Sequence, residues 1–572
     1  MAFQVSPGVN VSEQDLTTVV PNVATTIGAC AGGFQWGPVL ERTQISTEND
    51  LVRIFGKPNA DSYKWFWTAA NYLAYANNLW VVRNVGASAR NAVVGDTDVG
   101  TAILVNNKDA YDSLTFSDQA FVAKYPGALG NSLKVRAIDS DGWGDSTINA
   151  DFLANFDRTP GTSTDVGNAG GASDEMHILV QDEDGLWTGT PGYVLEKHAF
   201  VSKASDAKRI DGSSNYAVDV MRNESKYAYV GMVTQFTAKS TGAGGNAGEA
   251  KAGTTFKEFN SATPAEAIPG GSLTLGVSND AQTDATLQAS NTLYLTPEVV
   301  DVTLLLGGAS SVIAGRWLVD NVAATRKDCM AFVSPAKASV VNNPGSEVSA
   351  LTTDNTALGS SSYAVMDSAW KYQYDRYRDV FMYVPMNGDI AGLCARTDYT
   401  NDAWWSPAGL TRGTIKNIVK LSWEASKANR DTMYPISINP IITQTGAGVV
   451  LWGDKTMQTV PSAFDRINVR RLFIVLEKAI SQAAKSMLFE FNDEFTRAQF
   501  VNMVSPFLRE VQGRRGITDF KVVCDGSNNT GTVIDNNNFV GDIYVKPTRS
   551  INYIQLNFIA ARTDVNFTEI GG

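Results

Sequence analysis

Apolar residues recur with helical spacing near the C-terminal end of the chain. Their positions are Val469, Leu472, Phe473, Leu476, Ile480 and Ala483. This pattern predicts an amphipathic helix that begins at Asn468 as its N-cap and packs one face on a core. A second helix is predicted from about Asp493 to Val511, ended by Gly513.

Three runs of apolar and β-branched residues come after these helices and predict strands. They are ITDFKVVC at 517–524, NFVGDIYVKP at 538–547 and INYIQLNFIA at 551–560. In the last run Ile554, Leu556 and Phe558 share one face, because successive side chains of a strand point to opposite faces.

The N-terminal end is also extended, and we interpret residues 1–20 as an arm. Its apolar residues alternate or follow one another closely at Val9, Val11, Leu16, Val19 and Val20. Apolar strands at both ends of a chain are aggregation hazards unless another subunit completes their edges. The pattern therefore favours linkage between subunits.

Two segments alternate strands with helices, as expected for a parallel sheet. Residues 24–86 contain a β-rich start, a helix over Tyr63–Tyr75 and the strand LWVVRNV at 79–85. Residues 300–336 predict a strand, a helix and a second strand. The following stretch, 337–362, is rich in Ser, Thr, Asn and Gly and predicts a linker or loop.

The middle of the chain is polar and rich in loop residues. Candidate strands at 177–182 and 227–233 within residues 140–290 indicate an exposed, β-rich domain. The Gly- and Asp-rich residues 87–120 predict a small insertion.

Together these patterns predict a multidomain protein that combines α/β and α+β architecture. Residues 1–20 form the N-terminal arm, 21–86 and 121–345 a middle and outer α/β domain with β-rich insertions, and 87–120 a small insertion. Residues 346–572 form a C-terminal domain with a mixed sheet flanked by helices, which ends in a C-terminal arm strand.

Composition and charge narrow the classes of function. The 572 residues are 44% hydrophobic and 19% charged, which is typical of a folded chain. A net charge of −12 disfavours binding to nucleic acid phosphates, and no run approaches the roughly 20 apolar residues of a membrane span. Four scattered cysteines and two histidines disfavour a zinc cluster.

The sequence shows no catalytic or cofactor-binding apparatus, so we expect no enzyme and no cofactor. GAGGNAG at 242–248 departs from the spacing of a dinucleotide fingerprint, and the acidic residues 182–184 lack the pattern of a calcium loop. The aromatic stretch 370–383 interleaves with basic residues, but the acidic chain favours a core or subunit interface over base stacking.

Several long segments of the chain match one known family. The longest are KYQYDRYRDVFMYVPMNGDIAGLCARTD at 371–398, SPAGLTRGTIKNIVKL at 406–421, VPSAFDRINVRRLF at 460–473, SPGVNVSEQDLTTVV at 6–20, RSINYIQLNFIA at 549–560, GFQWGP at 33–38 and YPGALG at 125–130. In these segments the chain resembles the tail sheath proteins of contractile-tailed bacteriophages.

The resemblance implies a structural subunit that forms stacked hexameric rings around a tail tube and contracts to drive the tube through the host envelope for genome ejection. It implies assembly in the host cytoplasm into the virion tail, with the tube, baseplate and tail terminator or neck proteins as partners, and neither nucleic acid nor membrane. The sheath of a phage-tail-like bacteriocin or related contractile injection system stays open as an alternative. An α/β hydrolase is disfavoured, because no nucleophile accompanies a base.

The resemblance also implies roles for particular residues. The arms would add strands to adjacent subunits through Val9, Val11, Leu16 and Val19 at one end and Ile554, Leu556 and Phe558 at the other. Arg470, Arg471 and Lys478 of the C-terminal helix would face an acidic tube, although a solvated helix face or pairs within the chain explain them equally well.

Overall fold

The computed structural model describes Val20 and residues 23–94, 103–117, 119–143, 153–233, 236, 240–241, 243–259 and 270–555. The chain forms two compact units. The larger unit spans residues 24–400 and 407–465, and the smaller unit contains residues 1–23, 401–406 and 466–572.

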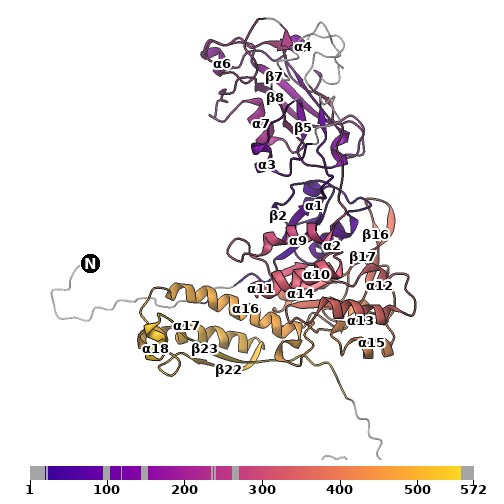
Figure 1. Ribbon diagram of the computed structural model, residues 1–572, viewed down its shortest axis with the longest axis vertical. Helices are drawn as coiled ribbons and strands as arrows, with labels where there is room; N and C mark the ends of the chain where they lie inside the picture. Colours follow the sequence, from indigo (N-terminus) through magenta and orange to yellow (C-terminus); the bar gives the residue numbers. More distant parts are fainter. Residues whose placement is uncertain are drawn as a thin grey trace, which may run out of the picture. The chain divides into compact units, whose positions relative to one another are not determined.

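A seven-stranded sheet organises the larger unit (Figure 1). Its order is β19 (Ile438–Asn439), β15 (Ala364–Asp367), β14 (Met330–Val333), β13 (Leu304–Leu306), β1 (Gly28–Gly33), β3 (Leu79–Asn84) and β2 (Arg42–Ile45). Neighbouring strands are parallel except for the pair β2 and β3. The strand–helix–strand prediction for residues 300–336 is confirmed, because β13 and β14 pair in parallel.

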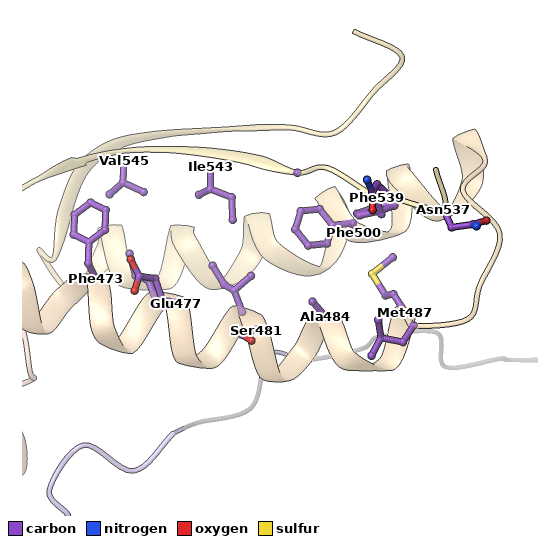
Figure 2. A pocket seen from close by; sticks show the side chains of 15 residues that line it. Phe473, Glu477, Ser481, Ala484, Met487, Phe500, Asn537, Phe539, Ile543 and Val545 are labelled. Carbon is purple, nitrogen blue, oxygen red and sulfur yellow. The ribbon is translucent and has the colours of Figure 1, made fainter. Parts of the chain in front are cut away.

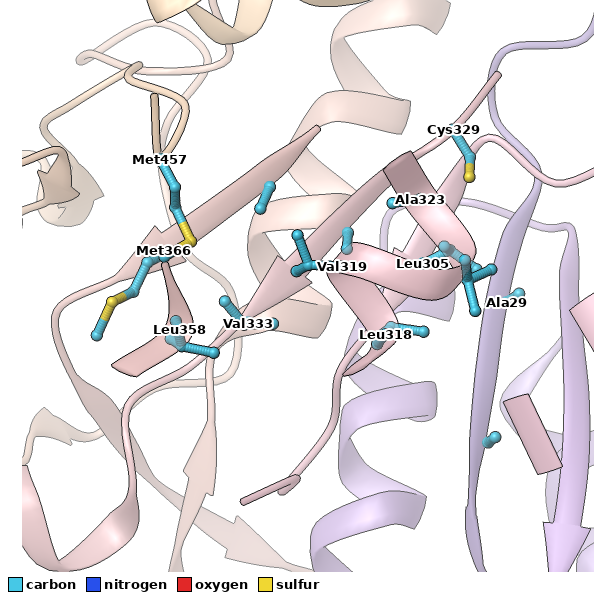
Figure 3. Close-up of a cluster of buried hydrophobic side chains, with 14 of the residues drawn as sticks. Ala29, Leu305, Leu318, Val319, Ala323, Cys329, Val333, Leu358, Met366 and Met457 are labelled. Atoms are coloured by element: carbon cyan, nitrogen blue, oxygen red, sulfur yellow. The ribbon is translucent and has the colours of Figure 1, made fainter. Parts of the chain in front are cut away.

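Helices flank this sheet, and its parallel strands are almost wholly buried, as is usual, whereas the antiparallel edge strand β2 is partly exposed. Helices α2 (Tyr63–Leu73) and α14 (Asn387–Thr400) contact each other and strands β1, β13 and β14. A separate group, α9 (Asp284–Asn291), α10 (Val312–Trp317) and α13 (Glu347–Leu358), accompanies a large apolar cluster that includes Leu305, Val319 and Leu358 (Figure 3).

The predicted linker at 337–362 is wrong, because most of it is helical. Helices α12 (Lys337–Val340) and α13 occupy the segment, and Leu351 and Leu358 are buried. Hydroxyl groups of α13 donate to carbonyls four residues earlier, as Thr352 does to Val348 at 2.8 Å. The small polar residues therefore line the exposed side of a helix whose apolar residues are few but correctly spaced.

Residues between β3 and α9 add the β-rich region that the sequence predicts. Strands β12 (Gly270–Ser272), β6 (Leu133–Ile138), β7 (Glu175–Asp182) and β8 (Tyr193–Ser202) form an antiparallel sheet in that order. Strands β4 (Val93–Val94), β5 (Phe121–Ala123) and β9 (Ala228–Val230) form a second sheet, and both contribute to one apolar cluster.

Arg83, at the end of β3, ties this β-rich region to the parallel sheet. Its guanidinium is fully buried and donates to the carbonyls of Phe34, Gln35, Gly37 and Pro126 at 2.7–3.2 Å. It also lies 3.6 Å from the Asp280 carboxylate. GFQWGP and YPGALG thus converge on one side chain, although they are far apart in the sequence.

The smaller unit has a helical hairpin covered by a short sheet (Figure 1). Its elements are α16 (Ile467–Ala484), α17 (Glu494–Gly513), β22 (Ile517–Val523) and β23 (Asp542–Pro547). Both predicted helices and the first two predicted strands are confirmed. The predicted cap Asn468 is wrong, because the N-cap of α16 is Arg466, two residues earlier.

Candidate functional site

The smaller unit contains an apolar groove between α16 and β23 (Figure 2). Its volume is about 620 Å³. Ile543 and Val545 of β23 line one side, and Phe473 and Ile480 of α16 line the other. Phe500 of α17 also lines the groove. In the part of the chain that the structure describes, β22 contacts α17, and the space between β23 and α16 remains open as the groove.

Strand β23 borders this groove with an open edge. In the described part of the chain β23 pairs with β22 alone, in antiparallel register from Ile517 and Pro547 to Val523 and Asp542. A two-stranded sheet is marginal by itself, and an open edge offers a row of N–H and C=O groups to another strand. A strand added to β23 would cover the groove and bury its apolar lining.

The turn between α16 and α17 extends this apolar surface. Leu488, Phe489, Phe491 and Phe495 are largely exposed, and Leu488 also lines the groove. Phe489 has a φ of 73°, an unusual conformation for an aromatic residue. A contiguous exposed apolar surface of this kind marks an interaction site.

Of the seven residues predicted to join adjacent subunits, the described structure contains only Ile554. Ile554 is 76% exposed, in a segment from 551 to 555 that forms no strand within the single chain. The other predicted arm residues, Val9, Val11, Leu16, Val19, Leu556 and Phe558, lie outside the described residues.

The sequence interpretation missed a contact of the N-terminal segment. Val20 and Val23 are buried, and both belong to the apolar cluster formed by α16, α17, β22 and β23. The alternating apolar pattern was a signal for burial, but it did not indicate which element the segment would contact.

The predicted tube-facing residues have different environments. Arg470 and Arg471 are buried in the first turns of α16, and Lys478 is half-buried. Contact with a partner by the two arginines would therefore require this surface to open.

The carboxyl ends of the parallel strands hold a second cluster of polar residues. Ser334 Oγ donates to Asp367 at 2.5 Å and accepts from Asn387 Nδ2 at 2.9 Å. Asn387 also donates to the Gly308 carbonyl and accepts from the Gly308 N–H. Asp367 and Asn387 are buried, and no histidine is among these hydrogen-bond partners. The cluster joins strand ends, and Asp367 is the acceptor for the Ser334 hydroxyl.

Stability should depend on pH through Asp367, because burial raises the pKa of its carboxyl to about 8. The folded protein then holds a proton that the unfolded chain releases near pH 4, so stability is full below that pH and falls as pH rises toward 8. The slope should reach about 1.4 kcal/mol per pH unit. In Asp367→Asn the free energy of unfolding, measured in urea, should depend less on pH between 5 and 8. If it falls equally steeply in this variant and in the native protein, Asp367 is not the titrating group.

The basic residues of the aromatic segment are engaged within the chain. Strands β16 (Trp370–Asp375) and β17 (Val380–Pro385) form a hairpin in which Tyr372 stacks on Phe381. Lys371 is buried and donates to Asp389 at 2.9 Å. Arg376 pairs with Glu48 at 2.6 Å. This arrangement is that of a packed hairpin and does not resemble a base-stacking surface.

Both histidines form hydrogen bonds within the β-rich region, and His198 Nε2 lies 3.3 Å from the Glu196 carboxylate. The His177 ring lies against Phe156, its Nδ1 accepts from the Phe200 N–H and its Nε2 bonds to the Arg158 carbonyl. Burial lowers the pKa of His177. The four cysteines are buried and unbridged. Within the described ranges, no cluster of metal-ligating side chains occurs and no helix is long and apolar enough to span a membrane.

Comparison with known proteins identifies the family. A profile described as "Phage tail sheath protein central domain" matches residues 314–457, and one described as "Phage tail sheath C-terminal domain" matches residues 459–561. The tail sheath protein of Vibrio phage KVP40 is 34% identical over 671 aligned positions, covering 99% of both chains. This chain belongs to the phage tail sheath proteins.

A further relative agrees with this assignment, and a solved structure shares the fold. The tail sheath protein of Enterobacteria phage T4 is 34% identical to this sheath protein and covers 99% of each chain. The sheath tail protein of Listeria innocua shares the fold with a TM-score of 0.51 at 11% identity, covering 92% of this chain and 96% of that one. The KVP40 alignment exceeds the 572 residues of this sheath protein, so that relative carries segments that this chain lacks.

Proposed function

We propose that this tail sheath protein polymerises as stacked hexameric rings around a tail tube, and that terminal arms link its copies. The observation that carries the proposal is the open edge of β23 beside an apolar groove of about 620 Å³. A terminal arm from a second copy would pair with this edge and place its apolar face over α16. Val9, Val11, Leu16 and Val19, or Ile554, Leu556 and Phe558, would supply that face.

Strand addition suits a sheath that changes shape. Each main-chain hydrogen bond contributes only about 0.5–1.5 kcal/mol net, but an added strand forms several and also buries side chains. The arms can then stay attached while the surfaces between subunits exchange their contacts. Contraction would be driven by a difference in packing, with no nucleotide and no catalytic step.

The same proposal gives the other parts of the molecule their positions in the sheath. The smaller unit would lie nearest the tube, with Lys478 as the most accessible of the three predicted contacts. The β-rich region would lie outside, where its loops can vary without affecting assembly. The tube, baseplate and neck proteins of a virion tail assembled in the host cytoplasm would be its partners.

Electron microscopy of purified protein tests this proposal. The full chain should form rings or hollow tubes in negative stain, and a variant lacking residues 1–19 should remain dispersed while keeping its thermal unfolding transition. Full-length protein that stays monomeric at concentrations where tail proteins assemble, and that is indifferent to the truncation, would contradict the proposal.

A further inference from the structure

The parallel sheet of the larger unit reverses its strand order between β1 and β13. From β1 the chain proceeds to β3 on one side, and later to β13, β14, β15 and β19 on the other. In open sheets of this kind, the carboxyl ends of the strands at the reversal leave a crevice in which ligands bind. Here β1 ends at Gly32 and Gly33, and β13 is followed by Gly307 and Gly308.

The indole ring of Trp65, from α2, occupies this crevice. A Cβ atom placed on Gly32 would lie 2.5 Å from the ring, and one placed on Gly308 would lie 2.4 Å from it. The ring thus lies against two backbone walls that only glycine permits. Asn387 fixes one wall, since its side chain donates to the Gly308 carbonyl at 2.7 Å and accepts from the Gly308 N–H at 3.0 Å.

We infer that this crevice is a binding site for a planar heteroaromatic group, which the chain fills with its own Trp65. Backbone walls cannot move into a vacated space as side chains do, so loss of the indole should leave a cavity. A cavity left by the removal of a large buried side chain binds small aromatic molecules when its walls are apolar. The site belongs to the larger unit and is separate from the groove proposed for assembly.

The test removes the indole and returns it as a free molecule. Trp65→Ala should lower the melting temperature by on the order of 10 °C, and free indole at millimolar concentration should recover much of that loss. If Trp65→Ala does not fold alone, refolding it with indole should yield folded protein. A folded variant that indole does not stabilise, or an unfolded one that indole does not rescue, would overturn the inference.

Two matched variants separate a specific site from general stabilisation. Trp67→Ala removes the next tryptophan of the same helix, which packs against the rings of Phe66 and Tyr377, and indole should not stabilise that variant. In Trp65→Ala/Gly32→Val the valine should refill the crevice, raise the melting temperature above that of Trp65→Ala and abolish the indole effect. Equal indole effects in all three variants would also overturn the inference.

Discussion

Replacing Arg83 with leucine is expected to lower the free energy of unfolding of the larger unit by about 4 kcal/mol or more. The change leaves the Asp280 carboxylate, which is 1% exposed, without its cation and four carbonyl groups without their donor. Burial lowers the pKa of Arg83 to about 10, so the native guanidinium is charged at neutral pH. Urea unfolding followed by tryptophan fluorescence measures the loss.

Two further variants test the cause of this loss. Arg53→Leu removes an exposed arginine whose pair with Asp50 is 3.0 Å long, and it should change stability by less than about 0.5 kcal/mol. Adding Asp280→Asn to Arg83→Leu should restore part of the stability, because the unpaired buried charge is then gone. If the losses of stability caused by Arg83→Leu and Asp280→Asn separately add up in the double variant, Arg83 and Asp280 do not act together.

Filling the groove beside β23 is expected to raise the protein concentration needed for assembly at least 10-fold while leaving the fold intact. Ser481 is exposed and lines the groove, so Ser481→Arg introduces a long charged side chain without removing a buried contact. That charge would have to be desolvated beneath an added strand. Sedimentation of assembled particles across a concentration series measures the effect.

The neighbouring residue supplies a matched control for the groove. Gln482 is also exposed and lies on α16, but it is not part of the groove lining. Gln482→Arg adds the same side chain to the same helix and should assemble as the native protein does. If both variants assemble normally, the groove does not receive a strand.

Local patterns in the sequence predicted the elements of the smaller unit. Helix α16 follows from the spacing of Val469, Leu472 and Leu476. The predicted bounds of α17, about Asp493 to Val511, lie close to the observed Glu494–Gly513. Residue spacing and helix-end signals act within a few residues, so they can be recognised without knowledge of the rest of the fold.

Features that depend on contacts between distant segments could not be predicted. The groove depends on how β22 and β23 pack with α16 and α17, which no periodicity encodes. The burial of Lys371 depends on Asp389, and the position of Trp65 depends on Gly32 in β1 and on Gly308, which follows β13. Helix α13 was missed for another reason, because its Ser and Thr content resembles that of a loop.

Amide hydrogen exchange of β23 tests strand addition most directly. Those amides of Asp542–Lys546 that point away from β22 should exchange quickly in soluble protein and become strongly protected in assembled sheaths, whereas Pro547 has no amide hydrogen. The chain end that supplies the added strand, within residues 1–19 or 549–560, should become protected at the same time as β23. Assembled sheaths in which β23 and both chain ends exchange as quickly as in soluble protein would contradict the account.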